Sequence, residues 1–227
     1  NEMIVKIQAL VFELKMVSDN IAHDLCTPLT RMRAMAEVAV GGSQDIESYK
    51  EVAYGTIEEC EQLMRMIKTM LEITRSESGI SNHIKEEVDI AKLVAMAYEI
   101  FHPLAEDKQI DFKLAASCAE PLLVEGDRLG LQRAVSNLLD NAIKYTGVGG
   151  RIEISAGISE DGKAVSIVVS DNGCGIGEKD LPHVFDRFYR CDSSRTMPGY
   201  GLGLCLAHAI VKANNGSVAV KSAIGNG

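Results

Sequence analysis

Asn137-Leu-Leu-Asp-Asn-Ala-Ile-Lys-Tyr145 is the stretch from which the fold can be worked out, because it gives an expected helix one polar and one apolar face. Positions 137, 141, 144 and 145 share a face, since residues three and four apart are neighbours on a helix. Two carboxamides and a lysine there suit phosphate groups and a hydrated Mg²⁺, which takes a few oxygen ligands and keeps waters. From this stretch alone, a merely solvated helix face is an equally good interpretation.

Around this helix, the chain from residue 79 onward mixes short apolar strands with helices. Strands and helices in runs, without strict βαβ alternation, predict a two-layer α+β sandwich. Asp89 is an expected helix N-cap. The expected strands are Ile84–Val88, Ile110–Leu114, Leu122–Glu125, Arg151–Ala156, Val165–Val169 and Ser217–Lys221, and the expected helices are Ile90–Glu106, Arg128–Tyr145 and Leu202–Asn214.

Two glycine-rich segments follow the central helix. In Asp171–Gly177 (DNGCGIG), alternate glycines let the backbone approach a ligand, and the Asp171 carboxylate can accept a hydrogen bond from an exocyclic amine. Gly199–Leu204 (GYGLGL) opens a helix at Leu202, where free N–H groups favour phosphate. The spacing matches neither a dinucleotide-binding βαβ unit nor a Walker lysine motif.

The segment between the two glycine-rich stretches is an expected mobile lid. It contains Pro182–Arg190 (PHVFDRFYR) and a polar stretch that runs to Pro198. Arg187, Arg190 and Arg195 are available there to bind phosphate charge.

Before residue 79 the hydrophobic periodicity is different, because apolar residues recur at alternating steps of three and four. This spacing predicts two long helices, broken at Gly41–Ser43, that form an antiparallel hairpin with a narrow apolar seam on each arm. Such a narrow stripe is better buried between two chains, so we expect a homodimeric four-helix bundle. The seam of the second helix comprises Ala53, Ile57, Cys60, Met64, Ile67, Leu71 and Thr74.

The first helix carries a candidate reactive histidine. In the heptad frame, His23 lies farthest from the seam and faces water, beside Asp24 and one turn before Thr27. Pro28 cannot donate to the carbonyl of Asp24, so a bend is expected there. A carboxylate can take a proton from one ring nitrogen while the other attacks, although a solvated surface histidine fits these residues alone better.

Composition limits the classes of function. The 227 residues include 23 Lys and Arg against 32 Asp and Glu, a formal charge of −9 that argues against nucleic acid as a partner. Six cysteines without CxxC spacing suggest neither a zinc site nor a disulfide framework, and they favour a reducing cytosolic compartment. No apolar run is long enough to span a bilayer, and we expect the chain to be a fragment, with a truncated C-terminus, of a longer protein.

Taken together, five segments resemble the H, N, G1, F and G2 boxes of bacterial sensor histidine kinases of two-component signalling. They occur in the family's order over nearly the whole chain. The segments are His23–Pro28 (HDLCTP), Asn137–Thr146 (NLLDNAIKYT), Asp171–Gly177, Val184–Arg190 (VFDRFYR) and Gly199–Leu204.

For the first domain, the resemblance implies a dimerisation and phospho-acceptor hairpin over residues 1–78. His23 would be the phospho-acceptor and Asp24 the general base. Thr27 would position water when the enzyme dephosphorylates its partner, the receiver domain of a response regulator. The family also implies a cytoplasmic portion of a receptor anchored in the bacterial inner membrane.

For residues 79–227, the resemblance implies an ATP-binding sandwich shared with gyrase, mismatch-repair ATPases and heat-shock chaperones. Asn141 would hold Mg²⁺ with Asn137 nearby, Lys144 and Tyr145 would contact phosphate and nucleotide, and Asp171 would bind the adenine amine. Gly173, Gly175, Gly177, Gly201 and Gly203 would shape the pocket and lid, and Arg187, Arg190, Gly199 and Leu202 complete the expected ATP site.

Two other functions remain as alternatives. A hydrolysing ATPase of the gyrase and chaperone type resembles this chain, but those enzymes have a glutamate that activates water where Asn137 stands, and an amide cannot act as that base. A dimeric signalling scaffold without catalysis is the other, since fold alone does not prove activity. Cys174 fills a variable position of the family's pattern, Cys26 stands where the family often has arginine, and the chain ends at Gly225–Gly227, where the family usually has a closing strand.

Overall fold

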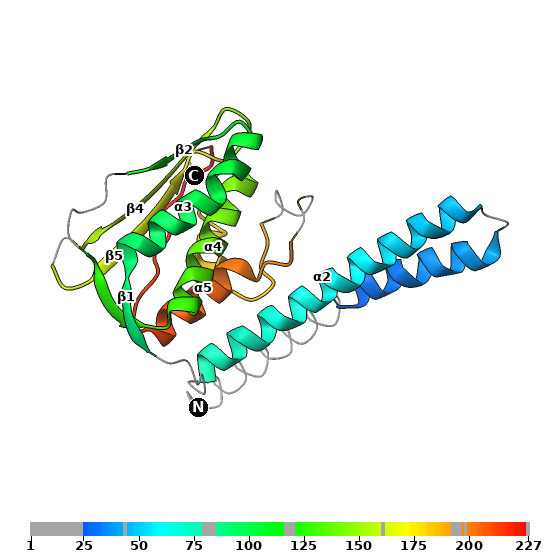
Figure 1. The fold of residues 1–227 in the computed structure, drawn as a ribbon, viewed down its shortest axis with the longest axis horizontal. Helices are drawn as coiled ribbons and strands as arrows, with labels where there is room; N and C mark the ends of the chain where they lie inside the picture. Colours follow the sequence, from blue (N-terminus) through cyan, green and yellow to red (C-terminus); the bar gives the residue numbers. More distant parts are fainter. Residues whose placement is uncertain are drawn as a thin grey trace.

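The computed structural model describes residues 25–42, 45–78, 85–115, 121–159, 162–191, 197 and 199–225 (Figure 1). A helical hairpin precedes a unit of mixed helices and strands, which confirms the predicted fold class. In chain order, the elements are a helix over residues 25–41, α2 (Ile46–Ser78), β1 (Glu86–Asp89), α3 (Ile90–Asp107), β2 (Asp111–Leu114), β3 (Leu123–Gly126), α4 (Arg128–Tyr145), β4 (Arg151–Ile158), β5 (Val165–Asp171), the short 3₁₀ helix η1 (Leu181–His183) and α5 (Gly203–Ala213).

The helix over residues 25–41 runs antiparallel to α2, as Figure 1 shows. Arg31 forms an ion pair with Glu59 at 3.4 Å. One turn away, the two helices approach closely at Gly55, where a Cβ atom would lie 3.1 Å from the Met35 sulfur. These contacts use a different face of α2 from the predicted seam.

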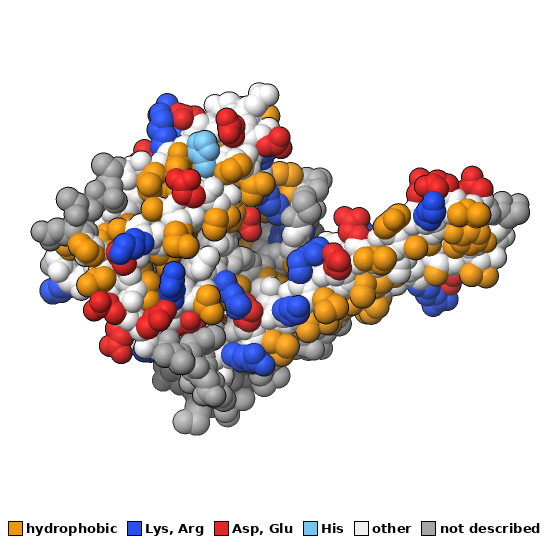
Figure 2. Space-filling view, viewed as in Figure 1, with side chains coloured by type: hydrophobic (Ala, Val, Ile, Leu, Met, Phe, Trp, Pro, Cys, Tyr) orange, Lys and Arg blue, Asp and Glu red, His pale blue; other side chains and the backbone are white. Residues whose placement is uncertain are grey.

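The large apolar residues of that seam remain exposed in the single chain. Between 43% and 55% of the surface of Ile57, Met64, Ile67 and Leu71 is accessible. Figure 2 shows orange side chains gathered along the hairpin. This face of α2 is therefore available for a partner helix.

Aspartates begin two of the helices. The predicted cap at Asp89 is confirmed, because its carboxylate accepts hydrogen bonds from the N–H groups of Ala91 and Lys92. Ahead of α2, the Asp45 carboxylate accepts a hydrogen bond from the Ser48 N–H at 2.9 Å, and bonds with Ser48 lower the pKa of Asp45. Both side chains satisfy N–H groups that the first turn of a helix leaves without partners.

The strands form two small sheets. β1 and β3 pair antiparallel, whereas β4 lies between β2, to which it is parallel, and β5, to which it is antiparallel. Helices α3 and α4 pack on one face of the three-stranded sheet (Figure 1). The core between these layers includes Val94, Phe101, Leu139, Ile152 and Ile154, all buried.

A second hydrophobic cluster joins the hairpin to the α/β unit. Met66 and Ile73 of α2 are fully buried against α5, where Leu206 and Ile210 are buried with them. Burial also raises the pKa of the Cys205 thiol in this cluster to about 11, so the thiol is neutral at physiological pH. The face of α2 that carries Met66 and Ile73 is thus occupied within one chain.

The strand expected over Ser217–Lys221 is not formed, which corrects the sequence prediction. The residues that follow this segment form hydrogen bonds with the glycine-rich loop after β5. The Ile176 N–H donates to the Ser222 hydroxyl at 2.8 Å, and the Gly225 N–H donates to the Cys174 carbonyl at 2.9 Å. Among the described residues, none of positions 217–221 forms a backbone hydrogen bond with a strand, so this segment has no ladder partner.

Within the described part of the chain, no helix has the length and hydropathy needed to cross a membrane.

Candidate active site

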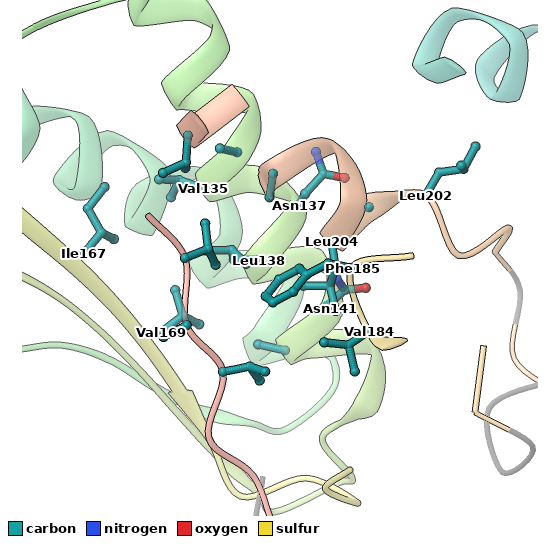
Figure 3. A pocket seen from close by; sticks show the side chains of 18 of the residues that line it. Val135, Asn137, Leu138, Asn141, Ile167, Val169, Val184, Phe185, Leu202 and Leu204 are labelled. Atoms are coloured by element: carbon teal, nitrogen blue, oxygen red, sulfur yellow. The ribbon is translucent and has the colours of Figure 1, made fainter. Parts of the chain in front are cut away.

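Helix α4 carries Asn137, Asn141, Lys144 and Tyr145, all partly buried. Figure 3 shows the two carboxamides beside the cavity. The Asn137 side-chain nitrogen donates to the Arg133 carbonyl at 2.8 Å, which leaves its oxygen for a ligand. The Lys144 ammonium lies 4.7 Å from the centre of the Tyr145 ring, within cation–π range. The structure thus brings the four predicted residues of this helix to one site.

The loop after β5 adds Asp171. One carboxylate oxygen of Asp171 accepts a hydrogen bond from the Gly173 N–H at 2.8 Å, which fixes the side chain. A Cβ atom at Gly173 would lie 2.6 Å from the Tyr145 carbonyl oxygen, so only glycine fits there. The Cys174 N–H donates to the same carbonyl at 3.3 Å. The loop is therefore anchored directly on the end of α4.

The second half of this loop packs on the chain near the C-terminus. Gly175 has a φ of +68°, and a Cβ atom there would collide with the Ala223 carbonyl. At Gly177, a Cβ atom would meet the Asp180 carboxylate at 3.3 Å. Both glycines allow the loop to pack closely on neighbouring protein atoms.

The start of α5 faces the carboxamides of α4. A Cβ atom at Gly203 would lie 3.1 Å from the Asn137 oxygen and 3.5 Å from the Asn141 nitrogen. Leu202, which directly precedes α5, is buried. This close approach leaves a narrow space in which the N–H groups of the helix start lie near the amides.

Two further glycines shape the path into α5. Gly201, with a φ of +69°, approaches the Tyr189 carbonyl, which would lie 2.5 Å from an added Cβ atom. Gly199 has a φ of +135°, and its Cβ position lies 2.8 Å from the Lys144 ammonium nitrogen. The predicted lysine and this glycine segment therefore meet at the same edge of the site.

The lid arginines hold protein groups in this structure. Arg187 forms an ion pair with Glu77 near the end of α2. Arg190 donates hydrogen bonds to the carbonyls of Met197 and Gly199, each at 2.5 Å. We expected these guanidinium groups to face phosphate, whereas here they tie the lid to α2 and to its own C-terminal part.

These elements surround one cavity of about 1570 Å³, larger than the roughly 300–1,000 Å³ of most ligand pockets. Its walls come from α4, β5, the lid and α5, with Phe185, Leu138 and Val169 among the apolar side chains in Figure 3. Residues Glu58 and Arg65 of α2 also line it. An apolar wall with carboxamides, a lysine and a fixed carboxylate is suited to a nucleotide.

Two family models match the chain. Residues 126–227 match the "Histidine kinase-, DNA gyrase B-, and HSP90-like ATPase" model, and residues 13–79 match the "His Kinase A (phospho-acceptor) domain" model. The chain belongs to the sensor histidine kinases. Most of the cavity wall therefore lies in an ATP-binding domain, and α2 of the phospho-acceptor range adds Glu58 and Arg65.

Individual proteins agree with this assignment. The sensor histidine kinase CusS of Escherichia coli strain K12 is 33% identical over 224 residues, which are 98% of this chain and 46% of CusS. The chain thus spans about half the length of this curated relative.

Solved structures share the fold. The Acinetobacter baumannii histidine kinase AdeS aligns with a TM-score of 0.69 at 22% identity, covering 89% of this chain and 92% of that one. Histidine kinase ThkA, solved in complex with the response regulator protein TrrA, aligns with a TM-score of 0.68 at 24% identity over 92% of this chain and 57% of that one.

The predicted residues of the first helix and the lid are described only in part. His23 and Asp24, and Arg195 of the lid, lie outside the described residues. Thr27 is described and exposed on the helix over residues 25–41. Leu25, two positions after His23, packs against the cluster that joins α2 and α5. The bend at Pro28 stays a prediction.

Sequence reasoning missed residues that support the site from other elements. Lys108, in the turn after α3, donates hydrogen bonds to the end of α4. On α2, Glu72 forms an ion pair with Arg133 at 2.6 Å, and Glu77 pairs with Arg187. No motif marks these positions, because each acts on a partner more than 30 residues away.

Proposed function

We propose that the chain is a histidine kinase core, which transfers the γ-phosphoryl group of ATP to His23 and then to an aspartate on the receiver domain of a response regulator. The observation that carries this proposal is Asn137. It occupies the position of the water-activating glutamate in hydrolysing relatives, and its amide nitrogen is bound to the Arg133 carbonyl. An amide cannot act as a base at neutral pH, so bound ATP would persist until an imidazole reaches it.

The described residues support a binding mode for ATP. Asp171, held by the Gly173 N–H, has a second oxygen to accept a hydrogen bond from the adenine amine. Lys144, at the other edge of the site beside Gly199, supplies positive charge for the phosphates. Glycine N–H groups at the start of α5 would donate to phosphate oxygens, as helix starts commonly do.

Mg²⁺ also fits the residues of this site. Among the described residues, no three His, Cys, Asp or Glu side chains gather as a metal site, so a cation would be held by amides, water and phosphate. Asn141 and Asn137 would supply the amide oxygens, which are hard ligands of the kind that Mg²⁺ prefers. When bound, the ion would neutralise charge on the phosphate oxygens.

The chemical step follows from the residues of the H box. One imidazole nitrogen of His23 would attack the γ-phosphorus, and the bond from phosphorus to the bridging oxygen of ADP would break. Asp24 would take the proton from the other ring nitrogen, so that the imidazole stays nucleophilic. In the reverse role as a phosphatase, Thr27 would position water for attack on the phosphorylated partner.

The same proposal covers assembly and domain boundaries. We place the dimerisation and phospho-acceptor domain at residues 1–78 and the ATP-binding domain at residues 79–227, which the two matched ranges support. The exposed seam of α2 supports a homodimer. ThkA was solved with a response regulator, which supports a receiver domain as the partner. Anchoring of the parent protein at the bacterial inner membrane stays a prediction.

Incubation with γ-labelled ATP and Mg²⁺ tests the function. We expect an acid-labile, base-stable label on the wild-type chain that is lost in His23→Gln. The matched control, His102→Gln on α3, should keep the label, because His102 lies against Tyr98 away from the cavity.

Three outcomes would contradict the proposal. Label that persists in His23→Gln would place the phosphoryl group elsewhere. Release of phosphate without any label would favour a hydrolysing ATPase, and neither label nor release would favour the signalling scaffold.

A further inference from the structure

The C-terminal end of α4 is capped by a side chain from a distant element. The last four carbonyl groups of an α-helix have no partners within the helix. The Lys108 ammonium, in the turn after α3, donates to the Ile143 carbonyl at 2.6 Å and to the Lys144 carbonyl at 3.0 Å. One cation thus satisfies two of the four groups.

The other two carbonyls are also partnered. The Ala142 carbonyl accepts from the Thr146 N–H at 3.0 Å, within the local turn. The Tyr145 carbonyl accepts from the Cys174 N–H in the loop that begins at Asp171. The end of α4 is therefore a junction at which Lys108 and the adenine-binding loop hold adjacent carbonyls.

The turn that carries Lys108 is itself fixed. Gln109 has a φ of +58°, and its carbonyl accepts a hydrogen bond from the Gly149 N–H at 2.9 Å. The Ile110 N–H donates to the Ala105 carbonyl at 2.8 Å, which closes the turn on α3. Lys108 is half-buried, so its ammonium is held against the negative end of the α4 dipole.

We propose that Lys108 is a positioning residue for the nucleotide site. By holding the carbonyls of Ile143 and Lys144, it fixes the last turn of α4, from which Lys144 and Tyr145 extend. Through the Tyr145 carbonyl, the same turn sets the position of the Asp171 loop. The inference rests on the proposed function, because it takes ATP as the ligand of that site.

Binding of ATP to the full chain tests this role, measured by calorimetry alongside kcat and KM for autophosphorylation. Lys108→Met keeps an unbranched apolar chain and removes the ammonium group with its donors. Loss of the groups that orient metal ligands weakens metal binding about ten- to a hundredfold, and we take the lower end of that range for this nucleotide site: about tenfold weaker ATP binding and a rise in KM that exceeds the fall in kcat. Lys108→Arg, which keeps a cationic donor, should recover most of the affinity.

The matched control is Lys113→Met. Lys113 lies on β2, where it pairs with Asp111 at the surface, and its loss should leave ATP binding unchanged. If Lys108→Met unfolds at a lower temperature than the wild type but binds ATP equally well, the proposal is overturned. Lys108 would then have a structural role only. If Lys108→Met does not fold, Lys108→Ala, which also removes the donors, is measured instead: weaker ATP binding supports the positioning role, and binding like that of the wild type overturns it.

The experiment separates this inference from the proposed function. A wild-type chain that binds no ATP would contradict the proposed function itself. A wild-type chain that binds ATP, with Lys108 variants that bind it equally well, would contradict the positioning role only.

Discussion

Among single residues, Gly175 is the position at which a substitution should have the largest effect on stability and binding. Its φ of +68° and its contact with the Ala223 carbonyl both exclude a side chain. We expect Gly175→Ala to lower the free energy of unfolding by more than the roughly 1–2 kcal/mol that left-handed backbone alone costs, and to abolish ATP binding. Urea unfolding and calorimetry with ATP measure the two effects.

Two other glycines serve as controls for this prediction. Gly162 has the same φ of +68° but no neighbour within 4 Å of its Cβ position, so Gly162→Ala should show the backbone cost alone. Gly157 on β4 also has open space around that position and no positive φ, so Gly157→Ala should be near neutral. Equal losses in Gly175→Ala and Gly162→Ala would contradict a role for the Ala223 contact.

These glycines also show what sequence could tell about the site. Alternate glycines predicted close approach of a ligand, and the segment does lie at the cavity. The structure adds that Gly173 and Gly175 are crowded by the carbonyls of Tyr145 and Ala223. Those partners are distant in sequence, so local spacing could not identify them.

At the scale of elements, α2 has two apolar faces with different roles. Ile73 is fully buried against the α5 cluster, so Ile73→Ala should lower the free energy of unfolding by about 2–5 kcal/mol. Ile100 lies on the exposed side of α3, so Ile100→Ala should lower the free energy of unfolding by less than about 0.5 kcal/mol. Chemical denaturation at equal protein concentration compares the two variants, and equal losses would show that α2 and α5 do not pack together in solution.

Element boundaries were predictable where one local signal was sufficient. Helix α4 has the bounds expected from its periodicity, Arg128–Tyr145, and α3 begins at the predicted cap. The prediction of a strand over Ser217–Lys221 was wrong, because the segment finds no neighbouring strand with which to form a ladder. Alternating apolar residues predict an extended chain, but not the partner with which it pairs.

At the scale of the whole molecule, the exposed face of α2 should hold two chains together. Leu71→Glu places a charge on this seam, which should convert a dimer to a monomer and halve the mass measured by light scattering. Leu104→Glu on α3 is the matched control, since the wild-type leucines have similar exposed fractions of 52% and 55%. A dimer that survives Leu71→Glu would mean that the two chains meet on another face.

The cluster that joins α2 to α5 has a consequence for exchanging parts between related kinases. The hydrophobic periodicity of the sequence changes near residue 79, so a chimaera of two kinases would naturally be joined there. Such a junction would combine a foreign α2 with the resident α5 and divide one hydrophobic cluster between two parents. A junction placed before Met66 would keep Met66 and Ile73 with the α5 residues they pack against, along with Glu72 and Glu77 and the arginines they pair with, and would separate this group only from Leu25. In this protein, the junction that divides fewest of these contacts lies inside a helix rather than at its end.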